Sequence, residues 1–99
     1  MNLKESMEMI DSLLSAPENK KIQEMLISNE LTQYARHLKL GQWIRNNCKM
    51  WHEGVDQINM DIDELNTSLK SNYPINEHPD DVSAILLDIY VDWKNNKIG

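Results

Sequence analysis

The side chains best suited to chemistry gather in two short segments, residues 37–47 and residues 78–83. The first contains Arg45, whose planar guanidinium suits a carboxylate, and the second contains the adjacent carboxylates Asp80 and Asp81. We expect Arg45 to join the segments as a structural ion pair; the alternative is that these side chains line a polar pocket. The expected cluster consists of His37, Trp43, Arg45, Asn46, His78, Asp80 and Asp81.

Asp80 and Asp81 follow Pro79 and therefore stand at the expected start of a helix. The positive end of the helix dipole stabilises ionised carboxylates there, whereas a general acid must retain its proton. Their position favours helix capping over catalysis. The same dipole disfavours a cationic imidazole, so we expect His78 to be a neutral hydrogen-bonding residue.

Metal binding and nucleophilic catalysis have few candidates in this sequence. Cys48 and His52 are four residues apart, but neither a Cys-x-x-Cys nor a His-Glu-x-x-His pattern accompanies them. Cys48 also lacks an evident third residue that would orient His52 as a base. The three glycines are isolated, so no phosphate-binding loop is expected. We therefore expect no metal, no cofactor and no enzymatic activity.

The two polar segments match a pattern that extends beyond their chemistry. Residues 37–47 follow H-x-x-L-G-x-W-I-R-N-N and residues 78–83 follow H-P-D-D-[MV]-S, and both resemble the motifs of a family of small bacterial domains of unknown function. The resemblance runs from the first expected helix to Ile89, but Cys48 stands where the family tends to have a further aromatic residue. The resemblance implies a shared fold and a shared polar centre, and it implies no activity.

The elements that position these segments are expected to be helices, because apolar residues recur at helical spacing. Asn2 can cap a first helix, and Pro17 suits the first turn of a second. Residues 28–30 are expected to cap a third, whose interior contains Gly41 at a cost of about 1 kcal/mol relative to alanine. A close neighbouring helix or a local break would explain that glycine. The apolar faces should contain Leu3, Met7, Ile10, Leu14, Ile22, Met25, Leu26, Leu31, Tyr34, Ala35, Leu38, Leu40, Trp43 and Ile44.

Two further helices are expected after a loop at residues 49–54. Asp61 and Glu64 have the spacing of a capping box for the fourth helix, and Pro79 opens the last. Their apolar faces should contain Ile58, Ile62, Leu65, Leu69, Val82, Ile85, Leu86, Ile89 and Trp93. The sequence thus predicts an all-α compact bundle of about five helices, as a single domain over residues 1–99.

The composition is that of a folded globular chain, with 40% hydrophobic and 26% charged residues among 99. No stretch approaches the roughly 20 apolar residues that a membrane helix needs, and the first ten residues lack a signal-peptide pattern. Cys48 is the one cysteine and cannot form a disulfide within the chain, as suits a reducing compartment. We expect a cytoplasmic protein that does not bind membranes.

The net charge of −6 is concentrated in one part of the chain. The segment from His52 through Asp92 contains ten acidic residues and one lysine, which disfavours nucleic-acid binding because phosphate contacts need clustered Lys and Arg. Such a surface favours a basic protein partner, unless it is simply solvated. The candidate partner-binding residues are Asp56, Asp61, Asp63 and Glu64.

We therefore expect a non-enzymatic protein-binding module, in particular an immunity-type inhibitor that neutralises a basic toxin or effector by masking its surface. One alternative is a pocket, with or without hydrolytic activity, that binds a small anionic ligand through Arg45, His37 and His78. Another is a regulatory subunit with an apolar patch at Met50 and Trp51. The pocket requires an Arg45 that no carboxylate of the chain has neutralised.

Overall fold

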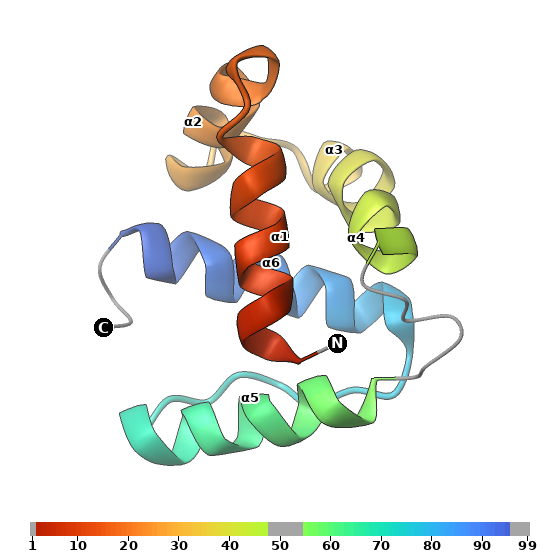
Figure 1. Cartoon of the computed structure of the whole chain (residues 1–99), viewed down its shortest axis with the longest axis vertical. Helices are drawn as coiled ribbons and strands as arrows, with labels where there is room; N and C mark the ends of the chain where they lie inside the picture. Colours follow the sequence, from red (N-terminus) through yellow and green to blue (C-terminus); the bar gives the residue numbers. More distant parts are fainter. Residues whose placement is uncertain (1, 48–54, 96–99) are drawn as a thin grey trace.

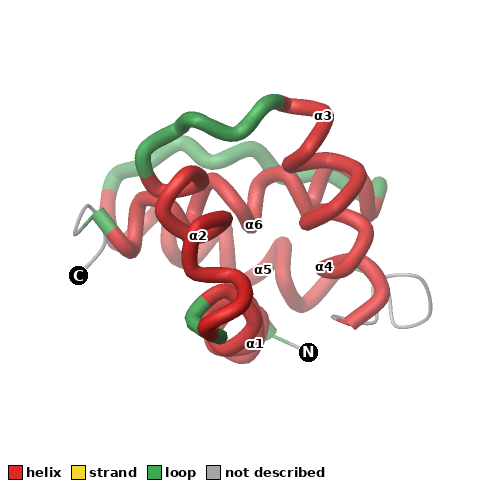
Figure 2. The backbone as a smooth tube through the Cα atoms, turned by 90° about the horizontal axis from the view of Figure 1, so that it is seen from above, coloured by secondary structure: helices red, strands yellow, loops and turns green. Residues whose placement is uncertain are grey.

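The computed structural model describes residues 2–47 and 55–95, which form helices and loops and contain no strand. The elements are α1 (Leu3–Leu14), the 3-10 turn η1 (Pro17–Asn19), α2 (Lys20–Ile27), α3 (Gln33–Ala35), the π turn η2 (Arg36–Gly41), α4 (Gln42–Asn47), α5 (Asp56–Leu69) and α6 (Pro79–Lys94). Figure 2 shows α3, η2 and α4 as one continuous helical path, and η1 leads directly into α2, so the described residues form five helical segments. The predicted all-α bundle is confirmed.

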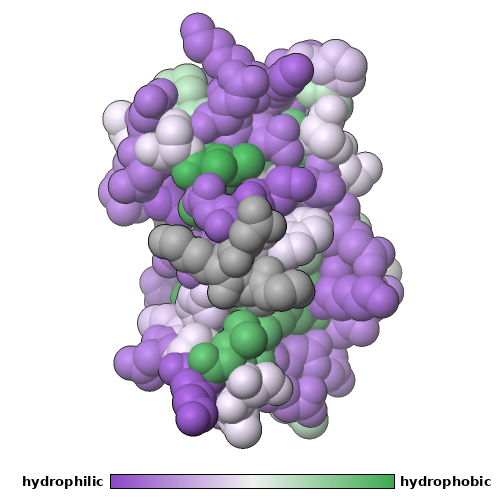
Figure 3. All heavy atoms as spheres, turned by 90° about the vertical axis from the view of Figure 1, so that its left-hand side faces the viewer, coloured by the Kyte–Doolittle hydropathy of each residue, from purple (hydrophilic) through white to green (hydrophobic). Residues whose placement is uncertain are grey.

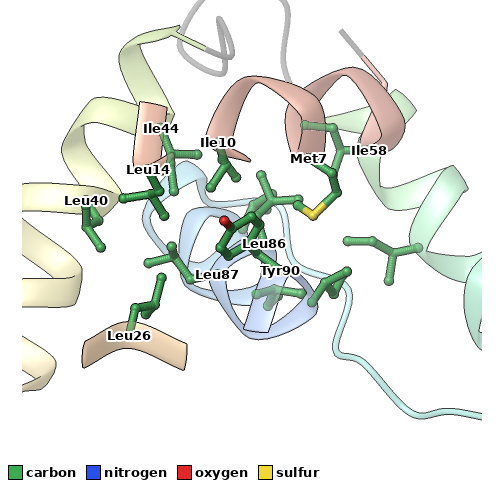
Figure 4. Packing of buried hydrophobic residues seen from close by; sticks show 14 of the residues in the cluster. Met7, Ile10, Leu14, Leu26, Leu40, Ile44, Ile58, Leu86, Leu87 and Tyr90 are labelled. Carbon is green, nitrogen blue, oxygen red and sulfur yellow. The ribbon is translucent and has the colours of Figure 1, made fainter. Parts of the chain in front are cut away.

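Helix α6 lies at the centre of the bundle, with α1 crossing in front of it and α5 below (Figure 1). Val82, Leu86 and Tyr90 are each 0% exposed, because their spacing places them on one face of α6. Figure 4 shows Leu86 and Tyr90 among apolar side chains from neighbouring helices, including Ile10 of α1 and Ile44 of α4. Helices α1, α2 and α4 and the turn η2 all contact α6, so the core is assembled around it.

The start of α1 is fixed by two sets of hydrogen bonds. Asn2 and Glu5 form a capping box, in which each side chain accepts a hydrogen bond from the other residue's backbone N–H. The N–H of Leu3 donates to Asp61 Oδ2 of α5 at 2.8 Å. Asp61 therefore helps to cap α1, and the predicted Asp61/Glu64 capping box is wrong because α5 already begins more than a turn earlier.

The third helical segment begins later than predicted and turns a different face to the core. Residues 28–30 follow the end of α2, so the predicted cap there is wrong; Thr32 caps α3 by accepting a backbone hydrogen bond. Tyr34 is 72% and Leu38 is 40% exposed, whereas Leu40 is 8% exposed. The π turn explains the difference, since its i→i+5 hydrogen bonding rotates the later residues relative to the earlier ones.

The loop between α5 and α6 is tied to both helices. Asn66 Nδ2 donates to the Tyr73 carbonyl oxygen at 2.9 Å, and Asn59 Nδ2 donates to the Asn76 carbonyl oxygen at 2.8 Å. The Tyr73 hydroxyl donates to Asp92 near the end of α6. These contacts hold the loop along both helices and thereby fix where α6 begins.

Candidate functional site

Arg45 joins α4 to the first turn of α6. Its side chain is 7% exposed; Nε lies 3.0 Å from Asp80 Oδ1, and Nη1 donates a hydrogen bond of 3.0 Å to Ser83 Oγ. Ser83 Oγ in turn donates to the Asp80 carbonyl oxygen at 2.8 Å. The Nε contact is a charge contact rather than a directed hydrogen bond, because its alignment does not meet hydrogen-bond geometry. We call these three residues the Arg45 clip; Asp80 makes the expected ion pair.

Gly41 makes room for the Arg45 clip. A methyl group at this position would lie 2.9 Å from Arg45 Nη1 and 3.3 Å from both Ser83 Oγ and the Arg36 carbonyl oxygen. The close neighbour predicted from this glycine is therefore present, and it includes Ser83 of α6. Gly41 also ends the π turn, and π turns are frequent at functional sites.

The other predicted cluster residues are more dispersed. His78 Nδ1 accepts a hydrogen bond from Asp80 N at 3.1 Å and caps α6, which requires an unprotonated Nδ1, as in the expected neutral imidazole. Asp81 and Asn46 are exposed, and Trp43 is half-buried. Outside the described part of the structure lie the side chain of His37 and the whole of Cys48, Met50, Trp51 and His52, together with the predicted loop at 49–54.

A cavity of about 120 Å³ adjoins the Arg45 clip. Its described lining consists of Gln33, Arg36, Gly41, Ser83, Ala84, Leu87 and Asp88. Arg36 Nη2 lies 2.8 Å from Asp88 Oδ1, so the arginine beside the cavity has a carboxylate of its own, as Arg45 has. Both arginines are therefore already neutralised by a carboxylate of the chain, which leaves neither charge for an anionic ligand.

Three of the four predicted partner-binding residues are available on the surface of α5. Asp56, Asp63 and Glu64 are exposed, and we call them the α5 acidic face. Asp61 is half-buried; besides accepting from Leu3 N, it accepts a hydrogen bond of 3.0 Å from the side chain of Gln57. Asp61 therefore contributes to the fold. Hydrophilic residues also cover most of the side shown in Figure 3, where apolar residues gather in smaller patches.

A groove of about 640 Å³ runs along the outer side of α1 and reaches α4. We call it the α1 groove; its floor contains the half-buried Met9, Leu13, Ala16 and Trp43, and its rim the exposed Glu5, Glu8 and Glu18. This groove was not predicted from the sequence. The pattern that could have indicated the groove is the i, i+4, i+7 spacing of Met9, Leu13 and Ala16 in the sequence. This spacing runs beside that of the residues that face the core.

The hydroxyl group of Tyr90 connects three helices. It donates to Asp11 Oδ1 of α1 at 2.8 Å and accepts from Gln23 Nε2 of α2 at 3.0 Å. Burial raises the pKa of Tyr90 to about 12, although the hydrogen bond from Gln23 acts in the opposite direction. Burial, and then the hydrogen bond to Asp92, likewise raises the pKa of Tyr73. Both phenols are therefore protonated at neutral pH and serve the fold.

Residues 2–47 and 55–95 offer neither a cluster of metal ligands nor a membrane-spanning helix. No three His, Cys, Asp or Glu side chains in these ranges are grouped so that they could hold a metal ion. No helix in these ranges combines the length and the apolar character needed to cross a membrane. The expected absence of a bound metal stays a prediction.

The chain matches the model of a known family. The family model described as "Domain of unknown function (DUF6794)" matches residues 1–94. The matched range includes the Arg45 clip, the adjoining cavity and the α1 groove. Neither the comparison with curated proteins nor the comparison with solved structures found a match.

Proposed function

The chain belongs to the DUF6794 family, and we propose, from its surface charges, that it is a non-enzymatic module that binds a basic protein partner through its acidic surface. The contrast between its arginines and its carboxylates carries the proposal. Arg36 and Arg45 are each neutralised by an aspartate of the same chain. The exposed residues Asp56, Asp63 and Glu64 take part in none of the ion pairs among described residues. Exposed carboxylates on a fixed helix direct a negative potential toward solvent.

In its narrower form, the proposal is an immunity-type inhibitor that neutralises a basic toxin or effector by covering its surface. Opposite charges on the two proteins speed their encounter, and like charges exclude acidic competitors. The partner would then be recognised first by its charge. A basic partner without toxic activity would support only the general form.

The main alternative, a pocket for a small anionic ligand, depended on Arg45 together with His37 and His78. The pairing of Arg45 with Asp80 favours the protein-binding module over this pocket, because the guanidinium already has a carboxylate and a hydroxyl partner. The other alternative, a regulatory subunit that docks through Met50 and Trp51, concerns residues outside the described part.

The partner can be identified by replacing Gln57, an exposed neighbour of the α5 acidic face, with a photo-crosslinking amino acid in the native cell. Tyr34, which is 72% exposed on α3, is the matched control position. A crosslinked protein with a basic surface, obtained from position 57 and not from position 34, supports the proposal. A partner that is acidic, or that crosslinks equally from both positions, contradicts it.

Association with the purified partner then tests the role of charge. The double variant Asp63→Lys/Glu64→Lys should slow association at least about tenfold at low salt and change dissociation much less, because exposed charges act on the encounter. The matched control is Glu24→Lys/Glu30→Lys, which changes the net charge equally at exposed positions in and after α2. Association that is insensitive to salt and to both double variants would remove the basis of the proposal.

A further inference from the structure

We propose that the α1 groove anchors a basic amphipathic helix of the partner protein, which lies along α1 with its apolar side on the groove floor and its lysines or arginines on the rim. This inference rests on the proposed function and adds the surface that holds the partner after the encounter. The α5 acidic face then governs how fast the two proteins meet. The α1 groove governs how slowly they separate, because aromatic and apolar anchors contribute most to the lifetime of a complex.

The floor of the groove is apolar surface that the fold leaves uncovered among the described residues. Met9 and Leu13 lie one turn apart on α1, on a different stripe from the buried Ile10 and Leu14, and Ala16 follows just after the helix in extended backbone. A groove lined in this way accepts an amphipathic helix, whose side chains interdigitate with such a stripe.

Trp43 gives the groove an anchor residue. It lies on α4, on the far side of the groove from the α1 stripe, and it is half-buried, so its ring both completes the floor and contacts solvent. Tryptophan is enriched among the few residues that supply most of the energy of protein interfaces. The Arg45 clip holds the same helix against α6, so the helix that carries the ring is in place before a partner arrives.

The rim determines the charge of the occupant. Glu5, Glu8 and Glu18 are its charged residues, and no lysine or arginine is among the described residues that line the groove. A second apolar hollow lies between α1, α5 and α6, but its charged lining residues are one lysine, Lys4, and one glutamate, Glu8. That hollow has no charge preference, whereas the α1 groove favours a cationic segment.

The dimensions of α1 bound the length of the occupant. The 12 residues of α1 span about 18 Å, which corresponds to about three turns of a partner helix lying alongside. The turn η1 closes one end of the groove, and Asn19 in that turn donates a hydrogen bond of 2.9 Å to the Leu13 carbonyl oxygen. The occupant is therefore a short helical segment of about three turns with a lysine- or arginine-rich side.

The test uses a synthetic amphipathic peptide of about 14 residues with leucines on one helical side and lysines on the other, and titration calorimetry with the full chain. A peptide with glutamate at every lysine position is the charge control and should not bind. Met9→Gln should weaken binding of the lysine peptide about five- to tenfold, since it removes apolar contact area. Met60→Gln, at a residue 60% exposed on α5, is the matched control and should leave the affinity unchanged.

A pair of charge variants separates the groove from net charge. Glu8→Lys/Glu18→Lys and Asp63→Lys/Glu64→Lys alter the charge of the chain equally, and both leave the Asn2/Glu5 capping box intact. The first should weaken peptide binding at least about tenfold more than the second. Equal losses, an unaffected Met9→Gln variant or no binding of the lysine peptide would each overturn the groove assignment. None of these results bears on association with the crosslinked partner, so the two proposals can fail separately.

Discussion

The charged members of the Arg45 clip differ in their access to water, and this difference decides how each affects stability. The side chain of Arg45 is 7% exposed, whereas that of Asp80 is 38% exposed. If the arginine is replaced, water can solvate the remaining carboxylate. If the charge of Asp80 is removed, a guanidinium remains in a site that water hardly reaches, which is the more costly arrangement.

We therefore predict that Asp80→Asn destabilises the fold more than Arg45→Met does. Asp80→Asn should lower the free energy of unfolding by about 2–3 kcal/mol, less than for a fully buried pair because water reaches one partner. Arg45→Met keeps an apolar side chain that can follow the aliphatic part of the arginine, so it should lower the free energy of unfolding by less. Urea denaturation followed by circular dichroism measures both.

The control for this comparison is Asp81→Asn. Asp81 is exposed in the same first turn of α6, so its replacement reports the helix-dipole effect alone, about 0.3–1 kcal/mol. If Asp80→Asn is no more destabilising than Asp81→Asn, the ion pair does not stabilise the fold and Arg45 becomes a candidate for ligand binding.

The sequence allowed one of the two arginine–aspartate pairs to be predicted. Arg45 and Asp80 lie in segments whose residue types already suggested an ion pair. Arg36 and Asp88 are 52 residues apart, and neither stands out among the charged residues of its helix. Their contact follows from how η2 lies on α6, so it could be found only after the packing of these elements was known.

At the scale of elements, the π turn η2 decides which residues between Gln33 and Asn47 face the core. A helix of regular pitch through this segment would bury Tyr34 and Leu38, as the spacing predicted. The wider turn leaves Tyr34 and Leu38 exposed, while Leu40 and Ile44 are buried as predicted, and it brings Gly41 against α6. A π turn requires no particular residue type, so hydrophobic spacing could not indicate it; Gly41 marked the place without specifying the geometry.

Gly41→Ala should destabilise the fold by about 1–3 kcal/mol, although alanine is the better helix former, because the added methyl group overpacks the Arg45 clip. Its neighbours include the Arg36 carbonyl oxygen, which belongs to the backbone and cannot easily move. Thermal and urea unfolding of the variant measure the effect. A more stable Gly41→Ala variant would show that the clip shifts without cost.

A double-mutant cycle tests whether Arg45 causes this cost. Methionine at position 45 does not extend as far as the guanidinium, so Gly41→Ala should cost less in the Arg45→Met background. Purely additive effects would mean that the methyl group is opposed by the backbone and by Ser83 instead.

For the whole molecule, the buried hydroxyl of Tyr90 is a point at which α1, α2 and α6 depend on one another. Asp11, which accepts its hydrogen bond, also forms an ion pair of 3.2 Å with Lys94. A negative charge on the Tyr90 oxygen would face that carboxylate without a proton between them. The bundle should therefore lose stability when this phenol ionises.

Burial raises the pKa of Tyr90 from 10.0 in the unfolded chain to about 12 in the fold. The folded state thus holds its proton more tightly, so the stabilisation is complete below pH 10 and is lost as the pH rises from 10 to 12. We predict a falling urea midpoint across this range. Tyr73, whose pKa is also raised, should add to the fall.

The variant Tyr90→Phe should show a lower midpoint at neutral pH and a shallower fall between pH 10 and 12. Both chains should carry Lys94→Arg, because arginine stays protonated and removes the titration of Lys94 from the comparison. Identical slopes for the two chains would show that Tyr90 does not cause the alkaline transition.

The central position of α6 also bears on how the chain folds during synthesis. Ile10 and Leu14 of α1 are 1% exposed in the finished bundle, yet 80 residues separate Leu14 from Lys94 at the end of α6. At about 5–20 residues per second, a ribosome needs on the order of 4–16 s to make that stretch. During this interval, the core stripe of α1 has no α6 to pack against, so the early helices can assemble fully only after α6 has left the exit tunnel.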